Sequence, residues 1–502
     1  MRKRVRFPKT FALFVGLAIL SGCGSSYESM TAPPPADFTL NVSPSSIFVP
    51  IGAGSSSLQL SVKAINGFNQ PVTISVTGLP AGVSTTPNSP FTVNVGASQT
   101  VVFSATNGML PGLEQVSFQG ALGTLSHSSP VSVSVANPVY AYVPSGYTDA
   151  SGTNFPPNDI VGFAVDANTG AISAVQGAAT SVPNPPLDIA VASEPGGAFV
   201  FALTSDGTTL GPGTLSSFKV DAATGSLAEV QTINYQPGTE QLNLVVHPSG
   251  KFLYVTQAGT SSCTLVYLVD SATGSLTQSS CSATGVLPTF APPGNFAYAP
   301  TVQGITQENM NIYSVNLTDG SLTLQQSLGT FTQNSRLLAS DPLGHALYNL
   351  AAKLGLTEPC GGFFIYSIDP STGSLTPVNT SIGPLCEPIW ISFTPANTFS
   401  YITNSSGNPN SAVAIYAGAV DPSTGNLANV PGSPFATSSH PTFGVVEPSQ
   451  GKFLIVIGGA PALQLLAYTI DPSTGALSQV SGVGTPFTST FPFKMVIVAP
   501  PH

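Results

Sequence analysis

The stretch "DPSTGSLTPV" at residues 369–378 returns almost unchanged as "DPSTGNLANV" at 421–430 and "DPSTGALSQV" at 471–480. The glycines of seven such copies follow one another at intervals of 46 to 55 residues. A period near fifty within β-patterned sequence is typical of the blades of a β-propeller. The sequence therefore predicts an all-β fold that contains a seven-bladed β-propeller. The four more divergent copies are "DANTG" from Asp166, "DAATG" from Asp221, "DSATG" from Asp270 and "NLTDG" from Asn316.

The residues of the repeat explain why it recurs. An Asp side chain accepts hydrogen bonds from backbone N–H groups about two residues further on. Proline presets φ for a turn, and glycine supplies the left-handed conformation that lets the chain return as an antiparallel strand. We interpret each copy as a hairpin between two outer strands, and its aspartate as a turn former rather than a catalytic carboxylate.

A second repeat lies between the copies of the first, as in "HPSGKFLYVTQ" from His247 and "DPLGHALYNLA" from Asp341. Each copy is a turn that joins two further strands, which gives four strands per blade. The seventh copy is missing. The repeat region opens at "VYAYVP" from Val139 and ends in "FKMVIVAPPH" from Phe493. We therefore expect the C-terminal segment to supply the innermost strand of the first blade and to close the ring.

The Asp-x-x-Thr-Gly-x-Leu hairpins, the "PSGKFLYV" hairpin and the period near fifty resemble the lactonase-like seven-bladed propellers, which include 6-phosphogluconolactonases and muconate-lactonizing enzymes. The resemblance covers about residues 139–502. It implies a site at the central mouth, on the face that carries the blade-to-blade crossings and the irregular loops, because variable loops on a rigid scaffold carry function.

Enzymes of that family tend to place His and Arg just before the innermost strands, and this gives the candidate catalytic residues. His440 is the one residue that matches a family histidine, and we expect it to act as general base. Arg336 would contact an oxyanion or a carboxylate, and Glu387 or Asp188 would orient the base or act as acid. The crossings hold Asp188, Glu240, Arg336, Glu387, His440 and Lys494.

The alternative interpretation is that these are ordinary polar residues at the beginnings of loops. His247 and His345 fall in the turns of the opposite face, where we expect them to be solvent-exposed. No G-x-S-x-G, H-E-x-x-H or C-x-x-C motif occurs. The sequence predicts no metal and no cofactor.

The N-terminal segment resembles a bacterial lipoprotein signal. Five basic residues precede the apolar stretch "FALFVGLAIL", which runs into "LSGC" at Cys23. The resemblance implies cleavage after residue 22 and lipidation of Cys23, and hence a lipid anchor in the bilayer of a bacterial envelope. Because Gly24 rather than Asp follows the cysteine, we expect the outer membrane. The alternative is ordinary secretion with a chance cysteine.

Residues 23–37 are rich in Ser and Pro and predict a tether. Residues 38–136 alternate with period two in seven candidate strands, which indicates a β-sandwich. The stretch "GFNQPVTISVTGLPAGVSTTP" from Gly67 resembles bacterial Ig-like modules, which implies a spacer or an adhesive unit. The propeller would then occupy residues 137–502.

Four cysteines remain besides Cys23, in a compartment that permits disulfides. Cys263 and Cys281 lie nine residues on either side of Ala272 in the "DSATG" turn, which would place them opposite each other on adjacent strands. Cys360 and Cys386 lie symmetrically about Gly373, so a second disulfide is plausible by the same argument.

Removal of the signal would take five of the 12 basic residues and none of the 22 acidic ones, for a net charge of −15. Arg336 would be the single remaining arginine. Phosphate backbones need clustered Lys and Arg, so nucleic acid is excluded as a partner. Two hypotheses remain for what we expect to be a monomer. The first is a membrane-anchored scaffold that binds a small molecule, a glycan or an envelope protein at the propeller mouth. The alternative is an extracytoplasmic hydrolase of an uncharged lactone.

Overall fold

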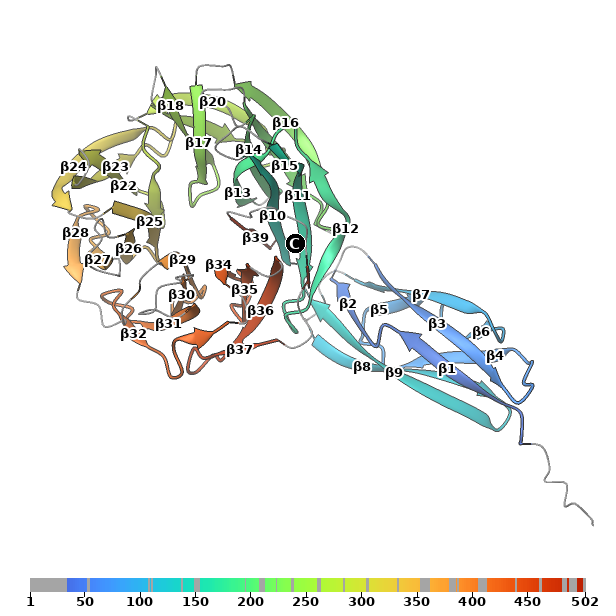
Figure 1. Ribbon diagram of the computed structural model, residues 1–502. Coiled ribbons are helices and arrows are strands. Elements are labelled where there is room, and N and C mark those ends of the chain that lie inside the picture. Colours follow the sequence, from blue (N-terminus) through green and yellow to red (C-terminus); the bar gives the residue numbers. More distant parts are fainter. Residues whose placement is uncertain are drawn as a thin grey trace, which may run out of the picture.

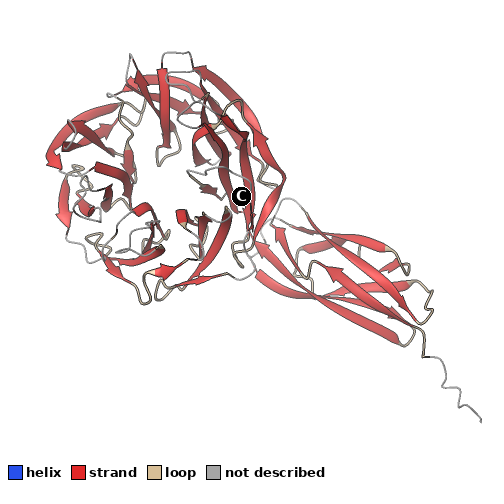
Figure 2. Cartoon of the chain, viewed as in Figure 1, coloured by secondary structure: helices blue, strands red, loops and turns tan. Residues whose placement is uncertain are grey.

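The computed structural model consists of strands joined by turns, and no helix occurs among the residues that it describes (Figure 2). A ring of seven sheets lies beside an elongated N-terminal unit of two sheets (Figure 1). The structure describes residues 34–499 apart from 52–54, 107–108, 110–111, 137–138, 149–153, 195, 207–212, 223, 236–238, 260–262, 283–284, 304–306, 332–333, 353–361, 379–384, 386–387, 405–412, 438–439, 460–462, 481–484 and 487–493.

The N-terminal unit contains two sheets, in the orders β1-β3-β7-β5 and β2-β9-β8-β4-β6. Their inward side chains share one hydrophobic core, which includes Phe38 and Phe103 from the first sheet and Phe118 from the second. The alternation of buried and exposed residues along β4 is what a strand with one wet face requires. The strands are β1 (Asp37–Ser43), β2 (Ser46–Pro50), β3 (Ser56–Ile65), β4 (Val72–Thr77), β5 (Val83–Thr86), β6 (Phe91–Val93), β7 (Ser98–Ala105), β8 (Gly112–Leu122) and β9 (Leu125–Ala136).

Nine strands occur here instead of the seven expected. The two that sequence analysis missed, β2 and β5, are short, and β2 joins its sheet by pairing in parallel with β9. Such a strand has no local turn signal to mark its partner. The Ig-like character of this unit stays a prediction.

Seven sheets with four main strands each follow as blades 1 to 7, and most neighbouring sheets contact each other at their innermost strands. Blade 1 is β39 (Val496–Val498), β10 (Val139–Thr148), β11 (Asn154–Val165) and β12 (Ile172–Ser181). Blade 2 is β13 (Pro186–Glu194), β14 (Gly197–Ser205), β15 (Gly213–Val220) and β16 (Leu227–Tyr235). Blade 3 is β17 (Thr239–Val246), β18 (Phe252–Gly259), β19 (Cys263–Val269) and β20 (Leu276–Ser282). Blade 4 is β21 (Thr289–Ala291), β22 (Phe296–Gln303), β23 (Gln307–Val315) and β24 (Leu322–Phe331).

The last three blades repeat this order, and two of them carry a short additional strand. Blade 5 is β25 (Asn334–Ser340), β26 (Ala346–Ala352), β27 (Gly362–Ile368) and β28 (Leu375–Val378). Blade 6 is β29 (Pro388–Phe393), β30 (Phe399–Asn404), β31 (Ala414–Val420) and β32 (Leu427–Asn429), with β33 (Phe435–Ala436) beside β31. Blade 7 is β34 (Pro441–Val446), β35 (Phe453–Gly458), β36 (Gln464–Ile470) and β37 (Leu477–Gln479), with β38 (Thr485–Pro486) beside β36.

The C-terminal strand closes the ring as the sequence predicts. β39 pairs antiparallel with β10, with Tyr140 opposite Val498 and Tyr142 opposite Val496. It is the innermost strand of blade 1 and lies beside the first propeller strand in Figure 1. The pairing covers the edge that β10 would otherwise expose.

The repeated aspartates form turns, as predicted. In the last copy, Asp471 Oδ1 accepts hydrogen bonds from the backbone N–H groups of Ser473, at 2.9 Å, and Thr474, at 2.8 Å. A hydrogen bond from the Ser473 hydroxyl, at 2.6 Å, is the largest of the contributions that lower the pKa of Asp471 to about 2. Gly475 closes the turn with φ of 74°. The carboxylate is therefore committed to local structure.

The glycine of each hairpin also permits the next blade to approach closely. A Cβ on Gly225 would lie 2.4 Å from the ring of Tyr140, which begins the second strand of the preceding blade. The architecture thus needs glycine twice, for its backbone conformation and for the missing side chain. The aromatic contacts are Gly170 with Phe453, Gly225 with Tyr140, Gly274 with Phe199, Gly320 with Phe252, Gly373 with Phe296 and Gly475 with Phe399.

The turns between the first and second strands also contact the neighbouring blades. One expectation about the histidines in these turns is wrong. His247 is 1% exposed rather than solvent-exposed, because the blade 4 turn covers it. Its Nε2 donates to the carbonyl of Gly294 at 2.9 Å, and its Nδ1 accepts from the backbone N–H of Ser249 at 3.1 Å. Burial lowers the pKa of His247, which favours the neutral ring. His345 is exposed, as predicted.

The first copy of the Asp hairpin, in blade 1, forms hydrogen bonds with the N-terminal unit. Asp166 is 4% exposed, and its Oδ1 accepts a hydrogen bond from the Ser134 hydroxyl at 2.9 Å. Asn168, where other copies have Ser, Ala or Thr, donates from Nδ2 to the carbonyl of Val135 at 3.0 Å. The turn of blade 1 is thus buried against the end of β9.

Candidate functional site

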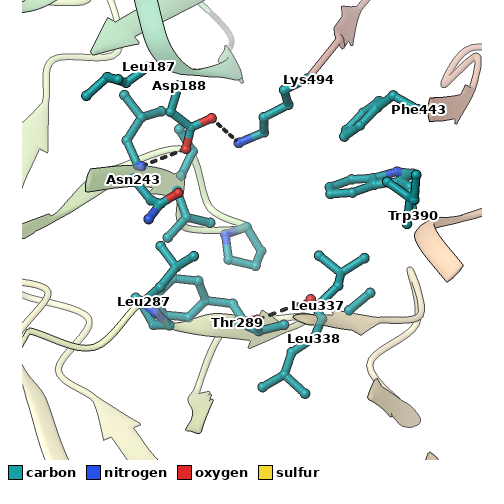
Figure 3. Close-up of a pocket in the computed structure, with 18 residues that line it drawn as sticks. Leu187, Asp188, Asn243, Leu287, Thr289, Leu337, Leu338, Trp390, Phe443 and Lys494 are labelled. Atoms are coloured by element: carbon teal, nitrogen blue, oxygen red, sulfur yellow. Dashed lines mark hydrogen bonds and ion pairs between the residues drawn. The ribbon is translucent and has the colours of Figure 1, made fainter. Parts of the chain in front are cut away.

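The innermost strands surround a central cavity of about 490 Å³. Blades 2 to 7 and the segment that leads into β39 of blade 1 contribute to its lining, so the cavity lies on the propeller axis. Figure 3 shows the lining residues. That volume is in the range of small-molecule sites. The lining residues are Leu187, Asp188, Asn243, Leu244, Val245, Val246, Pro248, Leu287, Pro288, Thr289, Phe290, Leu337, Leu338, Ala339, Ile389, Trp390, Phe443 and Lys494.

Irregularities at the beginnings of the innermost strands shape this cavity. The pairing register shifts between Pro186 and Asp188 in β13, and between Pro388 and Trp390 in β29. Such bulges re-aim side chains and are common beside active sites. The residues that the register skips in these two strands, Leu187 and Ile389, both line the cavity.

Asp188 is the most heavily bonded polar group of the cavity. Its Oδ1 accepts from the backbone N–H of Ile189 and from Lys494 Nζ, both at 2.8 Å. Its Oδ2 accepts from the backbone N–H of Leu244 at 2.9 Å. Figure 3 shows the ion pair at one side of the cavity. One carboxylate therefore links the innermost strands of blades 2 and 3 to the segment that leads into β39.

This pair is partly open to the cavity. The side chains of Asp188 and Lys494 are 9% and 24% exposed. Of the two lone pairs on Asp188 Oδ2, the Leu244 bond uses one, and Lys494 Nζ carries three protons, of which Asp188 takes one. A carboxylate that can accept a proton thus lies beside a cation that can stabilise a developing oxyanion.

The opposite side of the cavity is aromatic and aliphatic. The rings of Trp390 and Phe443 lie 4.0 Å apart between centroids, with 31° between their planes. In Figure 3 both rings point from their strands toward the side that carries the ion pair. Asp188 and Lys494 are the charged residues among the described lining. The cavity therefore offers one matched pair of charges in apolar surroundings.

The structure brings only part of the predicted site together. Asp188 lines the cavity with Lys494, which lies 306 residues away in the chain. His440 is exposed just before β34 and is not among the cavity lining of the described residues. Arg336 lies where the register of β25 shifts, at a position like those of Leu187 and Ile389. Its side chain and Glu387 lie outside the described residues, so the roles of His440, Arg336 and Glu387 stay predictions.

Sequence reasoning underrated Lys494 and did not consider Trp390. Both lie at the beginning of an innermost strand, the position from which the candidate residues were drawn. Lys494 is one of the crossing residues, but its sequence context indicates no role for it. Trp390 is the single tryptophan of the chain, which would have been a usable signal.

A disulfide joins Cys263 and Cys281, as the sequence predicts, with 5.7 Å between their Cα atoms. It connects β19 and β20 at their ends away from the "DSATG" turn. The proposed pair of Cys360 and Cys386 lies outside the described residues. Within the described ranges, no group of three or more His, Cys, Asp or Glu side chains could hold a metal ion. No helix in that part of the chain is long and apolar enough to cross a membrane.

Comparison with known proteins agrees with this architecture. A family model described as "Lactonase, 7-bladed beta-propeller" matches residues 83–393. No curated protein matches the chain. A solved structure of a candidate 6-phosphogluconolactonase from Bacteroides uniformis has 19% identity and a TM-score of 0.53, covering 72% of this chain and 100% of its own. A structure named as the periplasmic gluconolactonase of Pseudomonas aeruginosa has 18% identity and a TM-score of 0.53, covering 72% and 99%. At these identities the likeness shows the fold alone.

Proposed function

The chain belongs to the seven-bladed β-propeller family of lactonases, and from this premise we propose that it hydrolyses an uncharged lactone in its central cavity. One observation carries the proposal: Asp188 and Lys494 form a 2.8 Å ion pair in the wall of a largely apolar cavity. In the mechanism proposed here, Asp188 rather than His440 acts as the general base.

Ester hydrolysis needs a base for water and a donor for the oxyanion. We assign the base to Asp188 Oδ2, which takes a proton as the water oxygen attacks the lactone carbonyl. Lys494 Nζ donates to the oxyanion of the tetrahedral intermediate. When the ring C–O bond breaks, the proton passes from Asp188 to the leaving alkoxide, and the product is a hydroxy acid.

The charges of the cavity favour a neutral substrate. The positive charge of Lys494 is already matched by Asp188, so a phosphate group would find no uncompensated cation among the described lining. Placing a dianion against apolar walls without a partner is costly. The side chains of Arg336 and Glu387 lie outside the described residues, so their roles stay predictions.

Substitution of the pair tests this assignment. We expect Asp188→Asn and Lys494→Met each to lower kcat/KM for glucono-δ-lactone by about 100-fold. The first variant removes the general base, and the second removes the group that stabilises the oxyanion in the transition state. Lys452→Met, at an exposed lysine in a turn of the opposite face, should leave it unchanged. His440→Ala should cost less than about threefold on this assignment.

The assay is steady-state hydrolysis above the uncatalysed rate, beside thermal unfolding of each variant to show that it folds. Faster turnover of 6-phosphogluconolactone than of the neutral lactone would contradict the proposed substrate. A larger loss in His440→Ala than in Asp188→Asn would return the role of base to His440.

We also propose that the protein is a lipoprotein of the bacterial envelope, anchored in the outer membrane through Cys23. The N-terminal unit, proposed as an Ig-like spacer, follows the anchor segment and precedes the propeller in the sequence. We expect Cys23→Ser to move the protein from the membrane fraction to the soluble fraction, or to block its processing, while Ser25→Ala remains membrane-bound. Membrane retention and normal maturation of Cys23→Ser would contradict the anchor.

The second candidate is a display scaffold that binds a small molecule, a glycan or an envelope protein without turnover. The separation of β9 from β10 by two residues in the sequence and the buried contacts of Asp166 favour it, because they would hold the propeller rigidly at the end of a spacer. Binding of neutral lactones without hydrolysis in the assay above would favour this alternative.

A further inference from the structure

Two aliphatic side chains that line the central cavity are well exposed. Leu187 and Leu287 are 38% and 41% exposed, and both line the cavity. Exposed aliphatic side chains that converge on a concave site mark a surface that an apolar partner covers. The walls thus favour a ligand with an apolar body.

Trp390 adds a flat aromatic ring on the other side of the cavity (Figure 3). It is partly exposed, whereas Phe443 behind it is 3% exposed. The 4.0 Å stack with Phe443 holds the indole in place, so a ligand that binds against it loses little additional side-chain freedom. A fixed indole that reaches into a cavity is suited to an aromatic partner, because offset-stacked aromatic rings attract each other beyond what their buried area alone contributes.

The ion pair supplies a hydrogen-bond donor for the polar part of a ligand in this cavity. Lys494 Nζ can donate to a carbonyl oxygen, and in Figure 3 it lies across from Trp390. We propose that the cavity selects neutral lactones fused to an aromatic ring, with the ring stacked on Trp390 and the carbonyl directed to Lys494. This rests on the proposed function for its lactone part, while the choice of an aromatic ligand rests on the wall alone.

Two matched cyclic amides test the preference for an aromatic ligand by binding alone, without a catalytic step. 3,4-Dihydroquinolin-2-one is a benzo-fused six-membered lactam, and δ-valerolactam has the same ring without the aromatic part. Both resist hydrolysis and offer the same carbonyl. We expect the benzo-fused lactam to bind about tenfold or more tightly by calorimetry. It should also change the fluorescence of Trp390, which reports on the cavity alone because the chain has 1 tryptophan.

Variants connect the preference to the indole. Trp390→Leu should bind the two lactams with nearly equal Kd, whereas Trp390→Phe, which keeps a flat ring, should retain most of the preference. If Trp390→Leu fails to fold, the fluorescence change in the wild-type protein and the Trp390→Phe data decide. Equal Kd values in the wild type, no binding of either lactam, or an unchanged preference in Trp390→Leu would overturn the proposal.

The outcomes separate this inference from the proposed function. Tight aromatic binding without turnover of any lactone would leave the ligand class standing and reject the hydrolase. Turnover of glucono-δ-lactone without aromatic preference would support the hydrolase and reject the role of Trp390.

Discussion

A chain truncated before residue 493 is expected to lose the cooperative fold of its propeller. The deletion removes β39 and with it Met495 and Ile497 from one core cluster, and Val496 and Val498 from another. Burial of each such side chain contributes about 1.5–3 kcal/mol, or roughly 6–12 kcal/mol for the four. This is comparable to the whole stability of a typical domain, about 5–15 kcal/mol.

The measurement is thermal unfolding followed by near-ultraviolet circular dichroism, in which the aromatic residues of the blades report. Deletion of residues 500–502, which leaves β39 intact, is the matched control and should unfold like the full chain. The N-terminal unit has its own core and should retain a separate transition. A truncated protein that keeps the melting temperature of the control would show that β39 is not needed to close the ring.

Closure is reinforced at two places other than the β10–β39 ladder. The hairpin of blade 1 contacts blade 7 through Gly170 and Phe453, in the same way as every other pair of blades with an aromatic contact. Asp188 of blade 2 holds Lys494 beside the C-terminal strand. The proposed catalytic pair therefore also stabilises the closed ring, which is why the assay of Asp188→Asn needs an unfolding control.

The blades were predictable because their signals are local. Asp471 and Gly475 specify a turn through contacts within five residues, and the spacing of such turns then fixes the number of blades. Even the closure could be predicted, since the segments from Val139 and Phe493 are the two halves of one missing hairpin.

The site was less predictable because its contacts are not local. Asp188 and Lys494 are 306 residues apart in the sequence, and the residues around each of them do not indicate the other as its partner. His247 looked exposed because its own turn leaves it open, and its burial comes from Gly294 in the next blade. Sequence reasoning could identify the strand beginnings as the right positions, but it could not choose among the side chains there.

The second large loss of stability is expected at a glycine where the turns of two neighbouring blades are in close contact. Gly344 lies in the blade 5 turn with φ of +73°, and a Cβ there would come 1.9 Å from the backbone carbonyl oxygen of Pro292 in blade 4. That oxygen cannot rotate away as a side chain could. We expect Gly344→Ala to lower the free energy of unfolding by roughly 2–6 kcal/mol, the sum of backbone strain and overpacking.

Gly432→Ala separates the two causes. Gly432 has a similar conformation, with φ of +87°, but its nearest neighbour is the edge of the Phe435 ring at 3.2 Å, which can shift. It should therefore lose only the strain, roughly 1–3 kcal/mol. Urea unfolding with an unchanged m-value measures both differences. Equal losses in the two variants would mean that blades 4 and 5 can move apart at this turn. A larger loss in Gly344→Ala means that the spacing of the blades is fixed by backbone contact, which is the rigidity that a preformed central cavity requires.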